Sequence, residues 1–220
     1  MNKRVVLLTG SMGRLGSAFC EKYYDDYIIV GCGRNKKSNF AHHFIQADVN
    51  TEAEKIVDET LLKFERIDVL INNAATYSIK PLIDIDQKTL SDLFITNVVS
   101  PHCLSIFVLK KFWMHKTEKN KKRNRNIINV SSISGLHVYR NQGAYAPSKA
   151  ALNLLTRYQA SEFAEYNIRV NAIAPTGFPS IITTESVADA LREMDQSNET
   201  GVIKVMDVKS PSEKQVQRDQ

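Results

Sequence analysis

Three side chains in the middle of the chain have the types and spacing needed to move a proton to or from a carbonyl oxygen. Ser132 ends a predicted strand, Tyr145 follows thirteen residues later, and Lys149 comes four residues after the tyrosine. Positions i and i+4 of a helix project from one face, so we expect Tyr145 and Lys149 to lie one turn apart. A phenol has an ordinary pKa of about 10, and a nearby ammonium lowers it. Ser132 would then hold a substrate carbonyl while Tyr145 supplies or removes the proton.

A tyrosine and a lysine four residues apart are common on exposed helices, so the pair alone has little weight. A glycine-rich loop near the N-terminus adds to it, because Thr9-Gly-Ser-Met-Gly-Arg-Leu-Gly16 joins a predicted strand to a predicted helix. Glycines let the backbone turn tightly and approach a pyrophosphate, whose charge a helix N-terminus stabilises. An ordinary turn before a helix is the alternative interpretation of this loop.

The end of the second predicted strand bears on which dinucleotide would bind. Enzymes that use NAD place Asp or Glu there, to accept hydrogen bonds from the ribose 2′-hydroxyl. This chain has Arg34 and Asn35 instead, with Lys36 and Lys37 close behind. A guanidinium suits a 2′-phosphate, so the sequence favours NADP over NAD, with a merely solvated arginine as the alternative.

These residues would be positioned by strands that alternate with helices along the whole chain, a pattern typical of a parallel sheet covered by helices on both faces. We therefore predict a single doubly wound α/β domain over residues 1–208, with a mainly parallel seven-stranded sheet, and a polar C-terminal tail over 209–220. The predicted strands are Val5–Thr9, Ile28–Cys32, Phe44–Ala47, Val69–Ile71, Ile127–Val130, Ile168–Ile173 and Val202–Met206. The predicted helices run to about Tyr24 and over Thr51–Phe64, about Lys88–Met114, Tyr145–Phe163 and Glu185–Met194.

Together these motifs resemble the short-chain dehydrogenase/reductase family of Rossmann-fold, NAD(P)-dependent oxidoreductases. The loop is similar to the family's T-G-x-x-x-G-x-G, with Thr9, Gly10 and Gly16 in register. Ser132 and the Tyr-Ala-Pro-Ser-Lys segment from Tyr145 stand at the family's spacing. The resemblance implies NADP-dependent interconversion of a carbonyl and an alcohol, a small-molecule substrate, and a homodimer or homotetramer.

The resemblance also implies roles for individual residues. Asn97 would anchor a water in the proton relay and complete a catalytic tetrad with Ser132, Tyr145 and Lys149. Lys149 would in addition hold the cofactor ribose. The implied cofactor-binding residues are Gly10, Ser11, Met12, Arg14, Leu15, Gly16, Arg34, Asn35, Asp48, Val49, Asn73, Ala74, Ala75, Tyr145, Lys149, Pro175 and Thr176.

The sequence departs from the family in two places. Arg14 stands where the family has its middle glycine, which is similar to the loop of pteridine reductases; an arginine that only pairs with the pyrophosphate is the simpler interpretation. About ten residues separate Pro175 from the helix that leads to the last strand, so the usual substrate lid is largely absent. Pteridine-reductase-like C=N reduction and a non-catalytic NADP-binding sensor or scaffold therefore stay open as alternatives.

Composition limits the remaining function classes. The net charge of +5 comes from six basic residues and one acidic residue between Lys116 and Asn126, which we interpret as a solvated loop, with no nucleic-acid partner. No stretch of consecutive apolar residues is long enough for a membrane span, so we expect no membrane partner. Three unpaired-looking cysteines and the lack of a secretory signal pattern predict a cytoplasmic protein. The histidines form no zinc pattern, while His137 and Tyr139 follow Ser132 closely enough to line a pocket.

Overall fold

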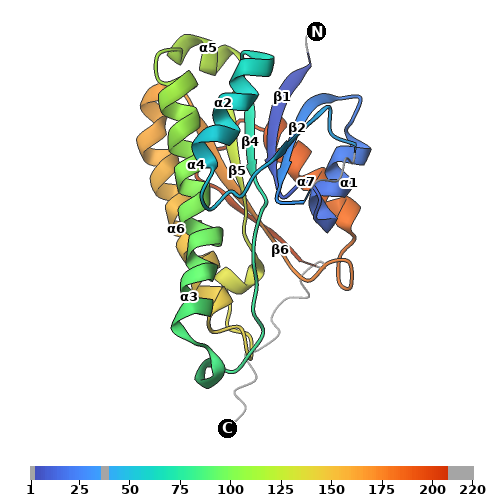
Figure 1. Ribbon diagram of the computed structural model, residues 1–220, viewed down its shortest axis with the longest axis vertical. Coiled ribbons are helices and arrows are strands. Elements are labelled where there is room, and N and C mark those ends of the chain that lie inside the picture. The colour runs from blue at the N-terminus through green and yellow to red at the C-terminus, as the bar shows by residue number, and fades with distance from the viewer. Residues whose placement is uncertain (1–2, 36–39, 208–220) are drawn as a thin grey trace.

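A single sheet of seven parallel strands forms the centre of the computed structural model, which describes residues 3–35 and 40–207 (Figure 1). The strands follow the order β3-β2-β1-β4-β5-β6-β7. Successive strands are added on one side of β1 as far as β3, and then on its other side from β4 to β7. Their bounds are β1 Arg4–Thr9, β2 Tyr27–Gly33, β3 His43–Gln46, β4 Val69–Asn72, β5 Asn126–Val130, β6 Arg169–Pro175 and β7 Ile203–Met206. The predicted doubly wound α/β fold is confirmed, and every strand pair is parallel.

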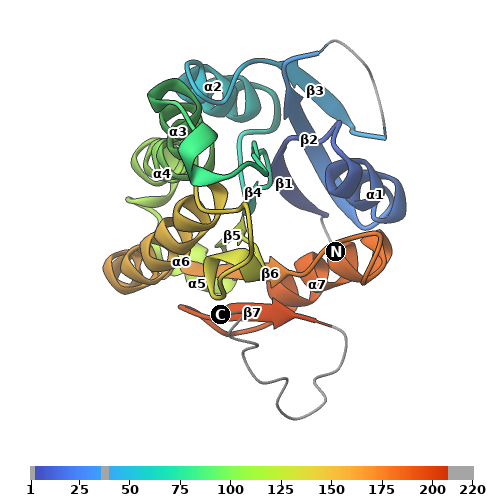
Figure 2. The ribbon, with the colours of Figure 1, turned by 90° about the horizontal axis from the view of Figure 1, so that it is seen from below.

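Helices cover both faces of this sheet (Figure 2). α1 (Arg14–Lys22) and α7 (Thr184–Gln196) pack side by side on one face. The other face carries α2 (Ala53–Phe64), α4 (Ser100–Val108) and α6 (Tyr145–Glu162), with α3 (Gln87–Phe94) and the short α5 (Thr117–Lys122) beside them. Helices on both faces leave the carboxyl ends of the strands open at one edge of the sheet, where ligands bind in folds of this kind.

The first strand shows why the sequence folds this way. Val5 and Leu7 belong to the apolar core on one face of the sheet, and Val6 and Leu8 to the core on the other. All four side chains are buried. A strand buried on both faces is a continuous apolar run without alternation, as β1 is.

The long helical stretch after β4 is interrupted twice. π-helical turns at Ile95–Val99 and Leu109–Trp113 follow α3 and α4, within the stretch predicted as one helical region. By length and composition the run Gln87–Trp113 is apolar enough to cross a membrane, with a mean hydropathy of 1.5 over the best window. Half of that window is buried inside the protein, and Leu104, Val108 and Trp113 pack into the core against the sheet. We interpret the run as a core helix.

The basic segment between α4 and β5 was wrongly predicted to be a solvated loop. Its first part forms α5, and Arg125 is buried at the start of β5. The Arg125 guanidinium lies 3.6 Å from the buried carboxylate of Asp68 and donates a 2.6 Å hydrogen bond to Asn120. A charge count cannot distinguish a buried, paired arginine from a solvated one, because both contribute the same formal charge. The predicted tail over 209–220, together with Lys36 and Lys37, lies outside the described residues.

Candidate active site

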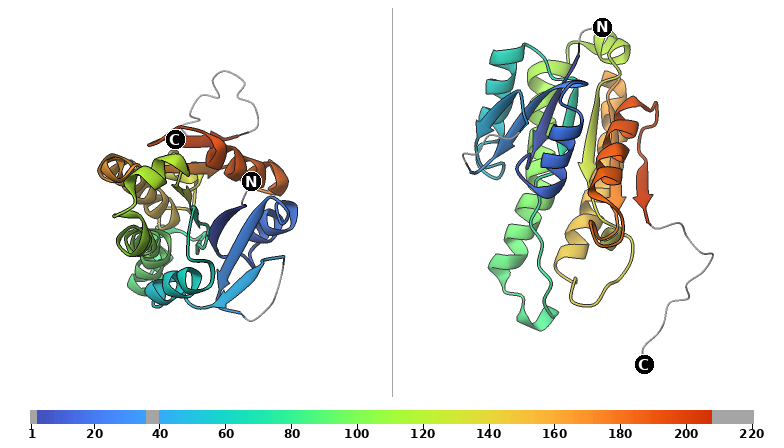
Figure 3. Two further views of the ribbon diagram at one scale, coloured as in Figure 1. Left: turned by 90° about the horizontal axis from the view of Figure 1, so that it is seen from above. Right: turned by 90° about the vertical axis from the view of Figure 1, so that its right-hand side faces the viewer.

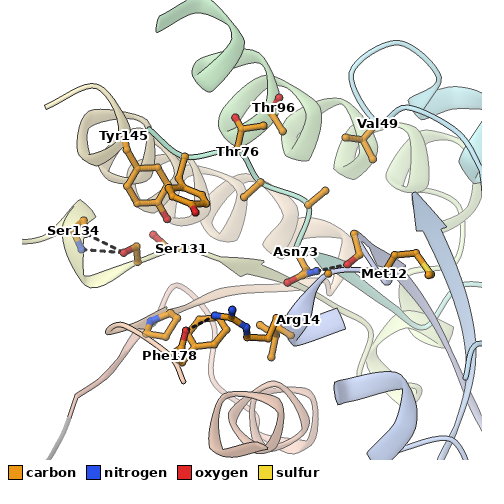
Figure 4. A pocket seen from close by; sticks show the side chains of 18 of the residues that line it. Met12, Arg14, Val49, Asn73, Thr76, Thr96, Ser131, Ser134, Tyr145 and Phe178 are labelled. Atoms are coloured by element: carbon orange, nitrogen blue, oxygen red, sulfur yellow. Dashed lines mark hydrogen bonds between the residues drawn. The ribbon is translucent and has the colours of Figure 1, made fainter. Parts of the chain in front are cut away.

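A cavity of about 990 Å³ opens at the carboxyl ends of the strands (Figure 4). Loops that follow six of the strands contribute to it, and α6 supplies its first residue, Tyr145. Of the predicted site residues, Gly10, Met12, Arg14, Leu15, Arg34, Asn35, Asp48, Val49, Asn73, Ala74, Ala75, Ser132, Tyr145, Pro175 and Thr176 line the cavity. Ser11, Gly16, Asn97 and Lys149 are buried and do not line it.

Two glycines of the loop after β1 are required by the backbone geometry. Gly10 has a φ of 64°, and a Cβ there would lie 2.9 Å from the Cα of Ala74. A Cβ at Gly16 would lie 2.3 Å from the carbonyl oxygen of Gly10. The loop can therefore fold tightly over the start of α1, which leaves a cradle for an anionic group at that helix N-terminus. This geometry fits the pyrophosphate of a dinucleotide.

The loop is fixed to the neighbouring strand by Thr9 and Asn73. The Thr9 hydroxyl accepts hydrogen bonds of 3.0 Å from the backbone N–H groups of Asn73 and Ala74. The Asn73 amide donates to the carbonyl oxygens of Thr9 and Gly10, at 2.9 and 3.0 Å. Asn73 thus holds the two loops together at the floor of the cavity, where Figure 4 shows it near Met12.

At the far end of the cavity, Arg34 and Asn35 follow β2 and are exposed. The described residues at this strand end include no carboxylate. Asp48 follows β3, and its carboxylate accepts a 2.9 Å hydrogen bond from the backbone N–H of Asn50. An exposed guanidinium at this place is able to pair with a phosphate on the ribose.

Tyr145 and Ser132 lie at the opposite end. The Ser132 hydroxyl accepts a 3.1 Å hydrogen bond from the backbone N–H of Ser134, which fixes its position at the end of β5. Burial raises the pKa of Tyr145 above its usual value, and hydrogen bonding with Ser132 lowers it in part. Burial has the larger effect, so the phenol is held protonated, in the form that can donate a proton.

Lys149 follows Tyr145 by one turn of α6, as predicted. Its side chain is buried, its Nζ donates a 2.8 Å hydrogen bond to the carbonyl oxygen of Val130, and it lies 5.8 Å from the centroid of the Tyr145 ring. Burial lowers the pKa of Lys149 to about 7. Burial therefore dominates the pKa of both groups here, and the role of Lys149 in lowering the pKa of Tyr145 stays a prediction.

Asn97 supports the site from behind the cavity wall. It is buried in the π-helical turn, where its Oδ1 accepts from the backbone N–H of Thr76 at 3.0 Å. Its Nδ2 donates to the Thr76 carbonyl oxygen at 2.9 Å and to the Ser148 hydroxyl at 3.0 Å. The side chain thus links the loop after β4 to α6, while the predicted anchoring of a relay water stays a prediction.

The segment between β6 and α7 is short, as predicted, and it is fixed to the cofactor loop. The Arg14 guanidinium donates a 3.0 Å hydrogen bond to the Phe178 carbonyl oxygen (Figure 4). The backbone N–H of Ile181 donates to the Gly177 carbonyl oxygen at 2.8 Å, which closes a compact turn. Sequence reasoning did not find this contact, since no local pattern relates residues 164 positions apart.

Several lining residues were also missed. Thr76, Tyr77 and Ile79 continue the loop after β4, Thr96 lies on the π-helical turn, and Gln142 precedes α6. Tyr139 lines the cavity as considered from the sequence, whereas His137 does not. The described residues contain no group of three or more His, Cys, Asp or Glu side chains that could hold a metal ion.

With the fold and the cavity in place, comparison with known proteins assigns the class. The chain belongs to the short-chain dehydrogenase family, whose pattern matches residues 4–191. It is similar to cyclopentanol dehydrogenase from Comamonas sp. (strain NCIMB 9872), with 30% identity over 204 residues, covering 86% of this chain and 78% of that one. Diacetyl reductase [(S)-acetoin forming] from Staphylococcus epidermidis (strain ATCC 35984 / DSM 28319 / BCRC 17069 / CCUG 31568 / BM 3577 / RP62A) is 27% identical over 212 residues, covering 90% and 80%.

Solved structures agree on the fold. A 4-hydroxyisoleucine dehydrogenase complexed with NADH and succinate superposes with a TM-score of 0.79 at 26% identity, covering 92% of this chain and 97% of that one. ElxO with NADP bound gives a TM-score of 0.81 at 24% identity, covering 93% and 97%. The protein is thus an oxidoreductase of a family that acts on alcohols and carbonyls, and its solved relatives bind NAD or NADP.

Proposed function

We propose that this protein interconverts a carbonyl and an alcohol with NADP(H), using Tyr145 as the general acid and base. The observation that carries the proposal is that Tyr145 and Ser132 face one end of the cavity whose floor is the Gly10–Gly16 cradle. When bound, NADPH supplies the hydride, and NADP⁺ accepts it in the reverse direction. Relatives named for alcohol oxidation and ketone reduction support the same class of reaction.

We assign each of the three side chains a step in proton transfer that fits its environment. Ser132 donates a hydrogen bond to the substrate oxygen, which polarises the carbonyl. Tyr145, kept protonated by burial, donates its proton to the oxygen as negative charge develops there. Lys149 stands behind Tyr145 and is able to change its protonation near neutral pH, so we assign it the resupply of that proton.

The preference for NADP rests on Arg34. Solved relatives bind either cofactor. In this chain, an exposed guanidinium and no described carboxylate follow β2. A 2′-phosphate would therefore find a charged partner, while a 2′-hydroxyl would find no carboxylate among the described residues at this strand end.

Pteridine reduction and a non-catalytic sensor role receive less support from the site. The similarity to pteridine reductases depends on Arg14, whose guanidinium donates to the Phe178 carbonyl oxygen. A sensor would bind NADPH without turnover. Replacing Tyr145 by Phe distinguishes it from catalysis, because the enzyme would lose turnover and keep NADPH affinity. Tyr24→Phe, at an exposed tyrosine after α1 that does not line the cavity, is the control, and turnover insensitive to Tyr145→Phe would contradict the proposal.

We also propose a homo-oligomer and a cytoplasmic location. Exposed apolar side chains stand on two neighbouring helical elements, Ile95 and Val99 on one and Leu154 and Tyr158 on the other. Such side chains are typical of an interface between subunits. The three cysteines are free, which is consistent with a reducing compartment. Light scattering on the purified protein measures the oligomeric state directly.

A further inference from the structure

Charge is distributed unevenly along the cavity. The strand order places β3 and β2 toward one end of the sheet and β5 and β6 on the other side of β1 and β4. Arg34 and Asp48 follow β2 and β3, whereas Ser132 follows β5 and stands near Tyr145. Figure 4 shows this separation, with Tyr145 on one side of the cavity and Val49 on the other.

Apart from Arg14 of the cofactor loop, the described lining residues near Tyr145 carry no formal charge. One N–H group of the Arg14 guanidinium donates to the Phe178 carbonyl oxygen, and we expect its positive charge to pair with the cofactor pyrophosphate. The Lys149 side chain is buried and does not line the cavity, and its Nζ donates to the Val130 carbonyl oxygen. Lys80 and Arg140 lie on neighbouring loops but do not line the cavity. The other polar groups at this end are uncharged, including the Gln142 amide.

Apolar side chains form a wall at the end of the cavity near Tyr145. We define the apolar wall as Tyr77 and Ile79 after β4, Tyr139 after β5, and Ile181 after β6, all of which line the cavity. Tyr77 is 75% exposed and Ile79 is 59% exposed. Large apolar side chains gathered at the mouth of a cavity and left this exposed have no packing role of their own, which indicates a ligand surface.

The loop after β4 and the loop after β5, which carry most of the apolar wall, are fixed to each other. The backbone N–H of Lys80 donates a 2.9 Å hydrogen bond to the Asn141 carbonyl oxygen. Leu82 packs so closely on Gly143 that a Cβ at Gly143 would lie 2.6 Å from the Leu82 Cγ. Figure 3 shows the two loops extending together beyond the ends of the strands.

We infer that the substrate of this enzyme is an uncharged carbonyl or alcohol with an extended apolar body, which lies along the apolar wall while its oxygen meets Ser132 and Tyr145. A carboxylate or phosphate on the substrate would lose its hydration at this end, and the one cationic lining residue nearby, Arg14, would already pair with the cofactor pyrophosphate. The inference rests on the proposed function and names the substrate class for the same site.

The test compares two series of ketones of increasing length. Kinetics with NADPH are measured for unbranched 2-alkanones from butanone to octanone and for 2-oxo acids of the same lengths. Each methylene that reaches the wall should raise kcat/KM about threefold to fourfold, from the transfer free energy of a buried CH₂. The 2-oxo acids should be poorer substrates than the matched ketones at every length. A flat or falling dependence on length, or a preference for the acids, would overturn the inference.

Variants of the apolar wall test whether these side chains cause the dependence on substrate length. Tyr77→Ser and Ile79→Ser should each reduce the dependence on chain length, while Val138→Ser should not, because Val138 is 99% exposed and does not line the cavity. Ile79→Lys should improve turnover of the 2-oxo acids relative to the ketones. A preference for acids that disappears in Arg14→Met would instead assign Arg14 as an anion partner and overturn the inference.

Binding separates failure of the inference from failure of the proposed function. Calorimetry measures the affinity of the same ketones for the protein with NADPH, whether or not turnover follows. Affinity that rises with length and falls in Ile79→Ser supports the substrate class even if no ketone is reduced, in which case only the proposed function fails. Affinity independent of length overturns the inference, and turnover of other carbonyls would then leave the proposed function standing.

Discussion

Asn97 holds both backbone groups of Thr76, accepting from its N–H at 3.0 Å and donating to its carbonyl oxygen at 2.9 Å. This pairing fixes the loop after β4, which carries Tyr77 and Ile79 at the cavity. Asn97→Ala should therefore lower the free energy of unfolding by about 1–3 kcal/mol, since it leaves partly buried backbone groups without partners. Urea unfolding at constant pH measures the change.

Ser148→Ala is the matched variant for this prediction. It removes one hydrogen bond of the Asn97 amide and leaves the Thr76 pairing in place. Its effect on stability should be smaller than that of Asn97→Ala. Equal effects would show that the link to α6 matters as much as the link to Thr76.

The buried Lys149 should make the stability of the cofactor-free protein depend on pH. Its pKa is about 7 in the folded protein, below its ordinary value of 10.5. Between these values the unfolded chain binds one more proton, so the stability contributed at this site rises with pH, by at most about 1.4 kcal/mol per pH unit. Below pH 7 both states are protonated and the destabilisation is complete.

Lys149→Met removes this titration. The stability of the natural protein relative to Lys149→Met should increase as the pH rises from 7.5 to 9.5, measured by thermal unfolding of both proteins in the same buffers. The comparison cancels every other titrating group. A difference in stability that does not change with pH would contradict the assigned environment of Lys149.

The Arg34 guanidinium should distinguish the two cofactors. Arg34→Ala removes a charge-assisted hydrogen bond to the 2′-phosphate and should weaken NADPH binding about 10- to 100-fold, with NADH binding little changed. Fluorescence titration with both cofactors measures the shift. Arg157→Ala on the exposed surface of α6 is the control for loss of a positive charge. Natural protein that binds NADH more tightly than NADPH would defeat the cofactor assignment.

The contact between Arg14 and Phe178 should control the mobility of the segment before α7. Arg14→Met removes the hydrogen bond to the Phe178 carbonyl oxygen, so the Ile181 and Ile182 amides, which donate to the Gly177 carbonyl oxygen, should exchange their hydrogens faster. The Val187 amide in α7 should exchange at its original rate. Unchanged exchange at Ile181 would show that the turn holds without Arg14.

The parts of the site that were predictable from sequence are those that depend on neighbours along the chain. Buried parallel strands are apolar runs, and the residues that follow them must meet at one edge, so Arg34 and Ser132 were found at strand ends. Asp48 was implied by the family resemblance. Gly10 and Gly16 were predictable because no other residue fits their backbone geometry.

The features of the site that could not be predicted depend on contacts between residues distant in sequence, or on how deeply a side chain is buried. Arg14 meets Phe178, and Arg125 pairs with Asp68, across separations that no periodicity records. The spacing of Tyr145 and Lys149 gave their shared helix face, but only the packed structure shows that burial raises the pKa of Tyr145 and lowers that of Lys149.

The turn from Gly177 to Ile182 is also a suitable position at which to insert a longer segment. It joins β6 to α7 at the rim of the cavity and is held at one side by a single arginine side chain. Each doubling of a flexible loop's length costs only about 0.6 kcal/mol, so a longer transplanted cover should be tolerated there. Grafting covers of different composition would turn this compact oxidoreductase into a scaffold whose substrate range is set by one exchangeable segment.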